Sequence, residues 1–401
     1  MPASGGGRLP VPRPPLPAPR AGCVSGPGSQ PCPSVLPTWF WHPYLGGTRT
    51  ARGTPAPIWD SAGLQGAEPA LEVMGTKPVE RYKALCAVVI DTGSGHTRSG
   101  LAGDEQPRSV VPSRAGGSPV LTHGVVTDWD GLEELWHRIL YQELGVCPEE
   151  VAVLATDAPL SPIANREKVA ELLFEGFGVP AMLVLPRSLL AAYSYGHTAG
   201  VVVGSGAGTS YAAGVQEGYA LPHATFRLDV AGDALTLYLG RLLGSRGVHL
   251  DADPLRRLKE TCCCVLPGAG GARPLTPPGT SGPLLGDERF RCPEALLAPA
   301  ALGLPGPGLL EQAALSLRRC GGPPGRPPPR LLLAGGTTLL RGFAGRLAAE
   351  LGVPPEAAPR RRVAAWLGGS LAASLDAFQD AWVPRDAYGE GGPAAVHPRC
   401  C

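Results

Sequence analysis

Two short segments that combine glycines with hydroxyl residues are the candidates for chemistry in this chain. The first, Asp91-Thr-Gly-Ser-Gly95, follows the apolar residues 85–90, which are typical of a buried strand. Glycines let the backbone of such a turn approach an anion closely, because the peptide N–H groups are exposed. Thr97, Arg98 and Ser99 then lead back into apolar sequence, so a hairpin is predicted, whereas a dinucleotide-binding fingerprint requires a helix. The pattern indicates phosphate binding.

The same arrangement recurs further along the chain. The apolar residues 200–203 run into Gly204-Ser-Gly-Ala-Gly208, and the chain again leaves through hydroxyl residues. A third apolar segment, residues 331–333, ends in Ala334-Gly-Gly-Thr-Thr338. Two similar hairpins and a third glycine turn predict two related halves that close on one nucleotide.

The elements that must hold these turns alternate between strands and helices, as in an α/β fold. Apolar spacing predicts helices at residues 130–143, 165–177, 188–195, 232–243, 254–264, 309–319, 343–351 and 371–378, and further strands at 151–155 and 182–185.

Composition limits the organisation and the partners. The chain has 401 residues, which is long enough for two domains, and a net charge of +1, which predicts no general attraction to nucleic acid or to membranes. No long uncharged apolar run occurs, so no membrane span is expected. Residues 1–80 are dominated by Pro, Gly, Ala and Arg and are predicted to be a disordered extension.

Several motifs, in the same order along the chain, resemble those of the actin family. Residues 91–103 look like the first phosphate loop of actin. Further similar motifs are Gly124-Val-Val-Thr-Asp-Trp-Asp130, Ala164-Asn-Arg-Glu-Lys168, Glu217-Gly-Tyr-Ala-Leu-Pro-His223, Glu288-Arg-Phe-Arg-Cys-Pro-Glu-Ala295 and Trp366-Leu-Gly-Gly-Ser370. The chain is therefore identified as a divergent actin-like protein, similar to the testis-type actin-like group.

This resemblance implies a ribonuclease H-like duplicated α/β fold with two lobes and a nucleotide cleft. Residues 81–194 plus 364–401 would form the first lobe, and residues 195–363 the second. Only residues 113–122 stand where actin has a small outer subdomain, so that subdomain is expected to be largely missing.

The resemblance also implies partners and location. Actin or actin-binding proteins are the expected partners, in the cytoplasm and cytoskeleton. The Gly- and Pro-rich residues 267–283 and 321–329 replace chain that packs between actin subunits. With the short outer segment, this departure predicts that the protein does not build conventional filaments alone.

The site residues are carried over position by position. Around the phosphates, the matching residues are Asp91, Gly93, Ser94, Gly95, Arg98, Ser205, Gly206 and Gly208. On the nucleoside side they are Lys259, Glu260, Gly335, Gly336, Thr337 and Arg362. ATP or ADP is the implied ligand, with Mg²⁺ or Ca²⁺ held weakly through Asp91, and a nucleotide-free chain is the alternative.

The hydrolytic side chains of the family are mostly replaced. Gly204 and Ala207 stand where two metal-organising aspartates belong, and Arg98 replaces a phosphate-binding lysine. Tyr211 replaces the histidine beside the attacking water, and Glu171 is assigned to the position of a water-positioning glutamine. Hydrolysis is therefore expected to be weak or absent, and the chain is interpreted as a structural protein that binds partners on a degenerate nucleotide-binding scaffold.

Other interpretations remain open. An ATP-binding, polymerising actin-type ATPase is the main alternative, and a sugar kinase or chaperone ATPase of the same broad fold is a further one. For single residues, Asp91 could cap its own turn, Lys259 and Glu260 could form a solvated surface pair, and Ser94 and Ser205 could bond only within their turns.

Overall fold

The computed structural model describes residues 86–268, 285–321 and 329–399, which belong to one compact unit, Lys77–Cys401. The predicted disorder of residues 1–80 falls outside the described residues. So do most of the two predicted loops, residues 267–283 and 321–329.

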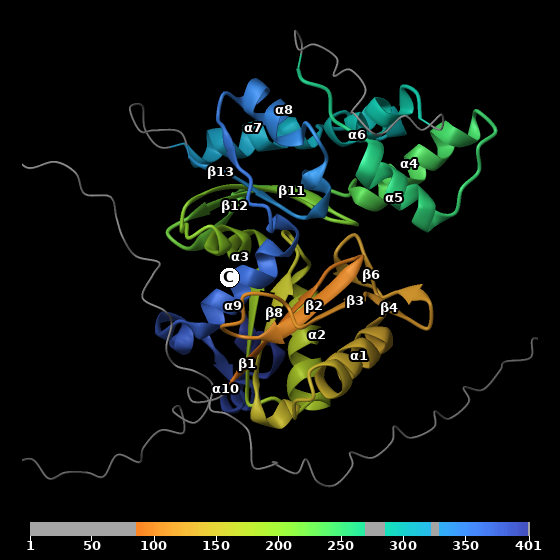
Figure 1. Cartoon of the computed structure of the whole chain (residues 1–401). Coiled ribbons are helices and arrows are strands. Elements are labelled where there is room, and N and C mark those ends of the chain that lie inside the picture. Colours follow the sequence, from red (N-terminus) through yellow and green to blue (C-terminus); the bar gives the residue numbers. More distant parts are fainter. Residues whose placement is uncertain (1–85, 269–284, 322–328, 400–401) are drawn as a thin grey trace, which may run out of the picture. The chain divides into compact units, whose positions relative to one another are not determined.

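The first of the two larger sheets contains the strands that the first glycine turn joins, and it has the strand order β15-β9-β8-β1-β2-β3 (Figure 1). Strands β1, β8 and β9 are parallel, whereas β2 and β3 continue from β1 as antiparallel hairpins. The strands are β1 Ala87–Thr92, β2 His96–Leu101, β3 Ser109–Pro112, β8 Ala152–Asp157, β9 Ala181–Pro186 and β15 Val383–Pro384. Every residue of β1 and β9 is buried, which explains why both read as continuous apolar runs.

The second of these sheets contains the strands that the second glycine turn joins, and it has the strand order β12-β11-β10-β13-β14. Strand β10 again has an antiparallel neighbour, β11, on one side and a parallel neighbour, β13, on the other. The strands are β10 Gly200–Ser205, β11 Ser210–Gln216, β12 Tyr219–Leu228, β13 Leu331–Ala334 and β14 Pro355–Glu356. Both glycine turns therefore join a buried central strand to its antiparallel neighbour, as predicted.

Helices cover both sheets. Those near the first sheet are α1 Trp129–His137, α2 Ile163–Glu171, α9 Ala364–Ser374 and α10 Arg385–Gly391, with π-helical turns at Arg138–Glu143 and Leu172–Gly176. Helix α3 Arg187–Ser194 packs against strands of both sheets. Those near the second are α4 Gly232–Gly244, α5 Ala252–Cys262, α6 Glu288–Leu297, α7 Leu309–Cys320 and α8 Phe343–Leu351 (Figure 1). Short 3-10 helices lie at Pro148–Glu150, Pro299–Leu302, Gly336–Leu339, Arg361–Val363, Asp376–Ala381 and Gly392–Val396. The predicted α/β class is confirmed.

Helix α9 differs from the prediction of a helix at residues 371–378. The helix is Ala364–Ser374, and a 3-10 helix, Asp376–Ala381, follows it. Its small residues allow close packing, because a Cβ atom on Gly368 would lie 1.7 Å from the carbonyl oxygen of Leu190 in α3. The Trp366 indole donates a hydrogen bond to the Val89 carbonyl of β1 at 3.2 Å. The Trp-Leu-Gly-Gly-Ser motif is thus the buried part of this helix.

The short segment that replaces the outer subdomain is more ordered than its sequence indicates. It forms two hairpins, β4 Arg114–Ala115 with β5 Ser118–Pro119, and β6 Leu121–Thr122 with β7 Val125–Val126. Val120, between them, is fully buried and anchors the segment to the first core. No helix occurs in residues 113–122, so the outer subdomain is as small as predicted.

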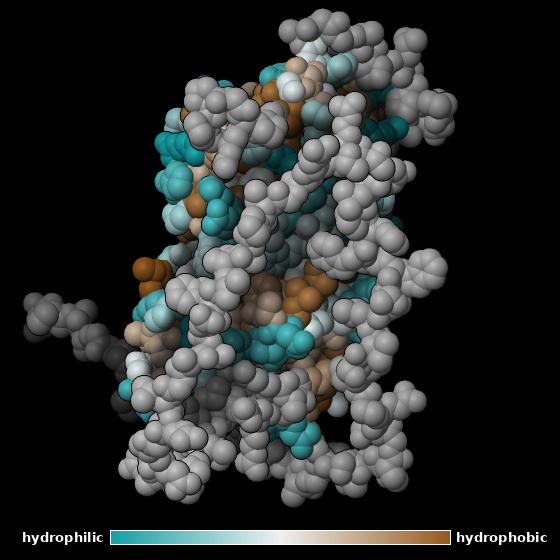
Figure 2. Space-filling model, turned by 90° about the vertical axis from the view of Figure 1, so that its left-hand side faces the viewer, coloured by the Kyte–Doolittle hydropathy of each residue, from teal (hydrophilic) through white to brown (hydrophobic). Residues whose placement is uncertain are grey.

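The described helices include none that is long and apolar enough to cross a membrane. On the face drawn in Figure 2, hydrophobic patches are separated by hydrophilic surface wherever grey atoms do not cover it. Exposed large apolar side chains are likewise distributed over several elements, for example Ile163 on α2, Leu237 on α4 and Leu371 on α9.

Candidate functional site

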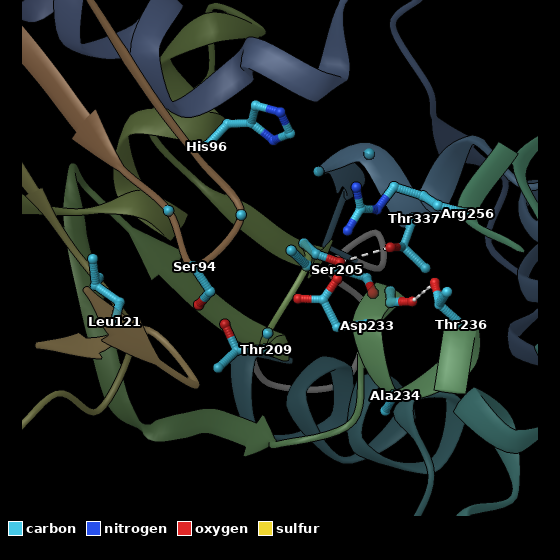
Figure 3. A pocket seen from close by; sticks show the side chains of 18 of the residues that line it. Ser94, His96, Leu121, Ser205, Thr209, Asp233, Ala234, Thr236, Arg256 and Thr337 are labelled. Carbon is cyan, nitrogen blue, oxygen red and sulfur yellow. Dashed lines mark hydrogen bonds between the residues drawn. The ribbon is translucent and has the colours of Figure 1, made fainter. Parts of the chain in front are cut away.

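A cavity of about 1090 Å³ lies where the glycine turns of the two sheets meet (Figure 3). The turns after β1 and β10 line it, together with the start of α4, the side of α5 and the turn after β13. Every residue that the sequence assigned to the nucleotide lines this one cavity, although nucleotide binding itself stays a prediction. A pocket of this volume is large enough for a nucleotide-sized ligand.

The two hairpin turns touch each other at their glycines. A Cβ atom on Gly95 would lie 2.8 Å from the Cβ of Ala207, and one on Gly208 would lie 2.5 Å from Ser94 Oγ. Ser94 Oγ also accepts a hydrogen bond from the Gly124 amide at 2.9 Å. Glycine is therefore required for close approach, and the alternative that Ser94 bonds only within its own turn is wrong.

Asp91 lies buried at the floor of the cavity between two guanidinium groups. Its Oδ1 accepts from Arg187 Nε at 2.9 Å and from Thr156 Oγ1 at 2.8 Å, and its Oδ2 accepts from Arg98 Nη1 at 3.3 Å. Arg187 also donates to the Thr92 carbonyl. Burial alone would raise the pKa of Asp91, but the charges of Arg187 and Arg98 outweigh it and hold the pKa below its usual value. The carboxylate is ionised and engaged within the protein.

Tyr211 fills the space beside Gly204. A Cβ atom at position 204 would lie 2.2 Å from Tyr211 Cζ, so an aspartate at this position requires the ring to move. Tyr211 is buried, and burial raises the pKa of its hydroxyl, which therefore stays protonated at neutral pH. A variant that places aspartates at positions 204 and 207 would therefore also need a smaller residue in place of Tyr211.

The second and third glycine turns are joined by a hydrogen bond and by close backbone packing. Ser205 Oγ lies 2.8 Å from Ser210 Oγ, which agrees with the alternative that Ser205 serves its own turn. Thr337 Oγ1 donates to the Gly206 carbonyl at 2.7 Å. Gly335 has a φ of 85°, and a Cβ there would lie 2.2 Å from the Ser205 carbonyl oxygen. The packing of the third turn on the second thus requires glycine at position 335.

Lys259 and Glu260 have different environments on α5. Lys259 is only 5% exposed, and its Nζ donates to the Gly232 carbonyl at 2.5 Å and to Thr236 Oγ1 at 2.8 Å. Burial lowers the pKa of Lys259. Glu260 is exposed and pairs with Arg362 at 3.5 Å. The alternative of a solvated surface pair is therefore wrong for Lys259, which joins α5 to α4 at the cavity wall.

Glu171 does not line the cavity, so its assignment to the water-positioning place is wrong. It is the last residue of α2, and it faces α10. Burial and Glu175 are the main causes that raise the pKa of Tyr388 on α10, and the charge of Glu171 adds to them.

Arg187, which the sequence analysis did not select, lies beside Asp91. It is the first residue after the parallel strand β9, and ligand sites of parallel sheets lie at such strand ends.

Charge is distributed unevenly around the cavity. Arg98, Arg187 and Lys259 are buried or half-buried, whereas the acidic lining residues other than Asp91 are exposed: Asp229, Asp233, Asp251, Asp253 and Glu260. Arg256, a further lining residue that the sequence analysis missed, lies on α5 (Figure 3). The cavity floor thus favours an anion.

Comparison with known proteins places this geometry in a family. The family model described as Actin matches residues 117–263 and 255–401, which together are more than half of the chain. The chain belongs to the actin family. It is 37% identical to Actin-like protein 7B of Mus musculus over 408 residues, covering 88% of this chain and 97% of that protein.

Two further relatives are similarly close. Actin-like protein 7B of Homo sapiens is 38% identical over 375 residues, covering 81% of this chain and 90% of that protein. Actin-like protein 7A of Mus musculus is 36% identical over 375 residues, covering 81% and 85%. The predicted membership in a divergent actin-like group is confirmed.

Proposed function

We propose that this chain is a structural protein of the actin cytoskeleton that binds protein partners, and that its cleft accommodates ATP or ADP without hydrolysing it efficiently. Membership in the actin family supports the cytoskeletal role. The arrangement of Asp91, Arg187 and Tyr211 supports the loss of hydrolysis, and it is the observation on which the proposal depends.

Hydrolysis requires a group that orients or deprotonates the attacking water. Asp91 has both carboxylate oxygens bound by guanidinium groups, so it is a weak base and is not free to hold a water. Tyr211 stays protonated, and Gly204 and Ala207 offer no polar side chain. The carboxylate that remains near the second turn is that of Asp233, whose amide donates to the Ala207 carbonyl at 2.8 Å.

The residues present fit a nucleotide as a ligand. Both glycine turns line the cavity, and the glycines leave their backbone N–H groups uncovered by side chains, as in turns that bind an anion. Arg98 and Arg187 would face the phosphates, and Arg256 is a further cation that lines the cavity. A bound nucleotide would supply the negative charge that links the two halves.

Phosphate release from ATP tests the proposal. We expect the purified chain, with Mg²⁺ present, to release phosphate at least about 100-fold more slowly than actin measured in parallel, because a positioned acid–base group typically contributes that factor. Asp233→Asn serves as the diagnostic variant. A rate comparable to that of actin, abolished by Asp233→Asn, would show that Asp233 has taken over the lost role and would refute the proposal.

A further inference from the structure

The cleft does not fit the divalent cation that accompanies nucleotides in this family. Mg²⁺ takes oxygen ligands, which are commonly carboxylates or the waters that carboxylates hold. Both oxygens of Asp91 are already bound, Oδ1 by Arg187 at 2.9 Å and Oδ2 by Arg98 at 3.3 Å. A divalent cation at Asp91 would have to displace both guanidinium groups and would be repelled by them.

The second turn supplies no replacement ligand set. Gly204 and Ala207 carry no side-chain oxygen, and Tyr211 presents a neutral phenol. Within the described ranges, no three or more His, Cys, Asp or Glu side chains come together in a way that could hold a metal ion. Asp233 contributes a single exposed carboxylate at the start of α4.

The charge that the floor offers instead is positive and fixed. The side chains of Arg98 and Arg187 are 16% and 13% exposed, and that of Asp91 is 6% exposed. Two guanidinium groups against one carboxylate leave an excess of one positive charge where the two glycine turns meet. Guanidinium groups match phosphate oxygens in a planar, two-pronged geometry, and they are weakly hydrated, so they suit a partly buried anion.

We propose that the cleft binds the phosphates of ATP or ADP without a divalent cation, and that Arg98 and Arg187 neutralise them in the cation's place. The inference rests on the proposed accommodation of a nucleotide and specifies how that site works. Asp91 then has a different role from the metal-organising carboxylate of the resemblance. It positions the two guanidinium groups and competes with the ligand for them.

Calorimetric titration of the nucleotide-stripped full chain with ATP tests the inference without any variant. The dissociation constant in excess EDTA and the one in excess Mg²⁺ should agree within about threefold, which is less than about 0.7 kcal/mol. Binding that requires Mg²⁺ would overturn the inference and leave the proposed accommodation of a nucleotide intact. No binding in either condition would overturn both the inference and that accommodation, whereas the proposed loss of hydrolysis is tested separately by phosphate release.

Two variants separate the roles of the charges. Arg187→Gln and Arg98→Gln should each weaken ATP binding in EDTA at least about tenfold, since a charge-assisted phosphate contact is lost. Arg385→Gln is the matched control, because Arg385 lies on α10, donates a hydrogen bond to the Gly178 carbonyl and does not line the cavity. Circular dichroism checks that each variant folds.

Asp91→Asn gives the sharpest distinction. If Asp91 only positions and competes, removal of its charge should strengthen ATP binding in EDTA by about threefold or more. If Asp91 is a metal ligand, the same variant should weaken binding in Mg²⁺ and leave binding in EDTA unaffected, which would overturn the inference. A Mg²⁺ requirement that disappears in Asp233→Asn would also overturn it and assign the cation to Asp233.

Discussion

Single substitutions in this cleft are coupled through contacts. Arg98 and Arg187 bind the same carboxylate, and Tyr211 occupies the volume beside Gly204. An aspartate at position 204 would therefore collide with Tyr211, and replacement of either arginine would leave Asp91 with a single guanidinium partner. The residues that differ from the actin pattern are thus compatible with one another: the buried charges of Asp91, Arg98 and Arg187 are paired, and the floor of the cavity keeps a net positive charge.

His96 gives the positive floor a pH dependence. Its pKa is held below the ordinary value of 6.5 by partial burial and then by Arg98, Arg256 and Arg362, while Asp233 opposes them. A bound polyphosphate adds negative charge and raises this pKa, so the bound form holds more protons below pH 6.5. ATP affinity of the wild-type chain should therefore rise, relative to His96→Gln, as the pH falls through that value.

The comparison between wild type and His96→Gln cancels the titration of ATP itself, because the ligand is common to both. Dissociation constants measured at several pH values on either side of 6.5 provide the check. Parallel pH profiles of the two proteins would show that His96 does not sense the ligand. In the ligand-free chain, the lowered pKa of His96 has the opposite consequence. The unfolded state binds a proton at a higher pH than the folded state, so the free energy of unfolding decreases as the pH falls below 6.5.

Residue roles could be predicted from sequence where they depend on local spacing. Ser94, Gly208 and Gly335 belong to turns that the glycine pattern marks, and all three line the cavity. Arg187 could not be found in this way, because its contact with Asp91 spans 96 positions and depends on the parallel order of the strands. Glu171 was assigned by position in the resemblance, and the structure places it away from the cavity, at the end of α2.

Among the elements, the glycine turns carry the strictest requirements. The turn after β13 enters a left-handed conformation at Gly335 and presses its backbone against Ser205. Helix α8 provides a contrast, since Gly345 lies in its interior and, apart from the backbone of the helix itself, no atom lies within 4 Å of the place where a Cβ would be. The same residue type therefore has opposite roles in two adjacent elements.

Gly335→Ala should destabilise the chain by about 2 kcal/mol or more, because a positive φ and a backbone collision both oppose the methyl group. Gly345→Ala should be neutral or stabilising by up to about 1 kcal/mol, since it only reduces the freedom of the unfolded chain. Urea unfolding of both variants measures the difference. Equal midpoints would contradict the packing described for the third turn.

The boundaries of the elements followed from sequence best where strands are buried on both faces. The hairpin around Asp91 and the one around Gly206 have the form that their glycines indicate. Helix α9 was displaced in the prediction because its glycines look like helix breakers, while the close contact of Gly368 with Leu190 in α3 makes them favourable. Tertiary packing decided that element, and periodicity alone could not.

For the whole molecule, assembly is the main question that follows. A filament needs two different complementary surfaces on each subunit. The segment between β3 and α1 contains only two small hairpins, in the place where the resemblance implies that actin has one of its subunit contacts. The division into lobes at residues 194 and 363 remains a prediction of the resemblance. The strands of the second sheet all lie between these two positions, and the strands of the first sheet all lie outside them.

We expect the purified chain to remain in the supernatant after high-speed centrifugation with ATP, Mg²⁺ and moderate salt, because one subunit contact is lost. A second sample containing actin filaments tests the partner interaction, and pelleting only in that sample would support filament binding through the retained surface. Abundant helical filaments of the chain alone, seen by electron microscopy, would refute this expectation.

The packing of α9 on β1 also determines when the first half of the protein can complete its core during synthesis. The Trp366 indole bonds the Val89 carbonyl across 277 positions, and β15 pairs with β9 near the end of the described chain. The strands of the second sheet all lie between these segments, in residues 200–356. During synthesis, the face of β1 that packs on α9 therefore stays without this cover until almost the whole chain has emerged. Contacts of such high sequence separation slow folding and leave apolar surface exposed for longer, so we expect the first core to be completed late, after the strands of the second sheet have been synthesised.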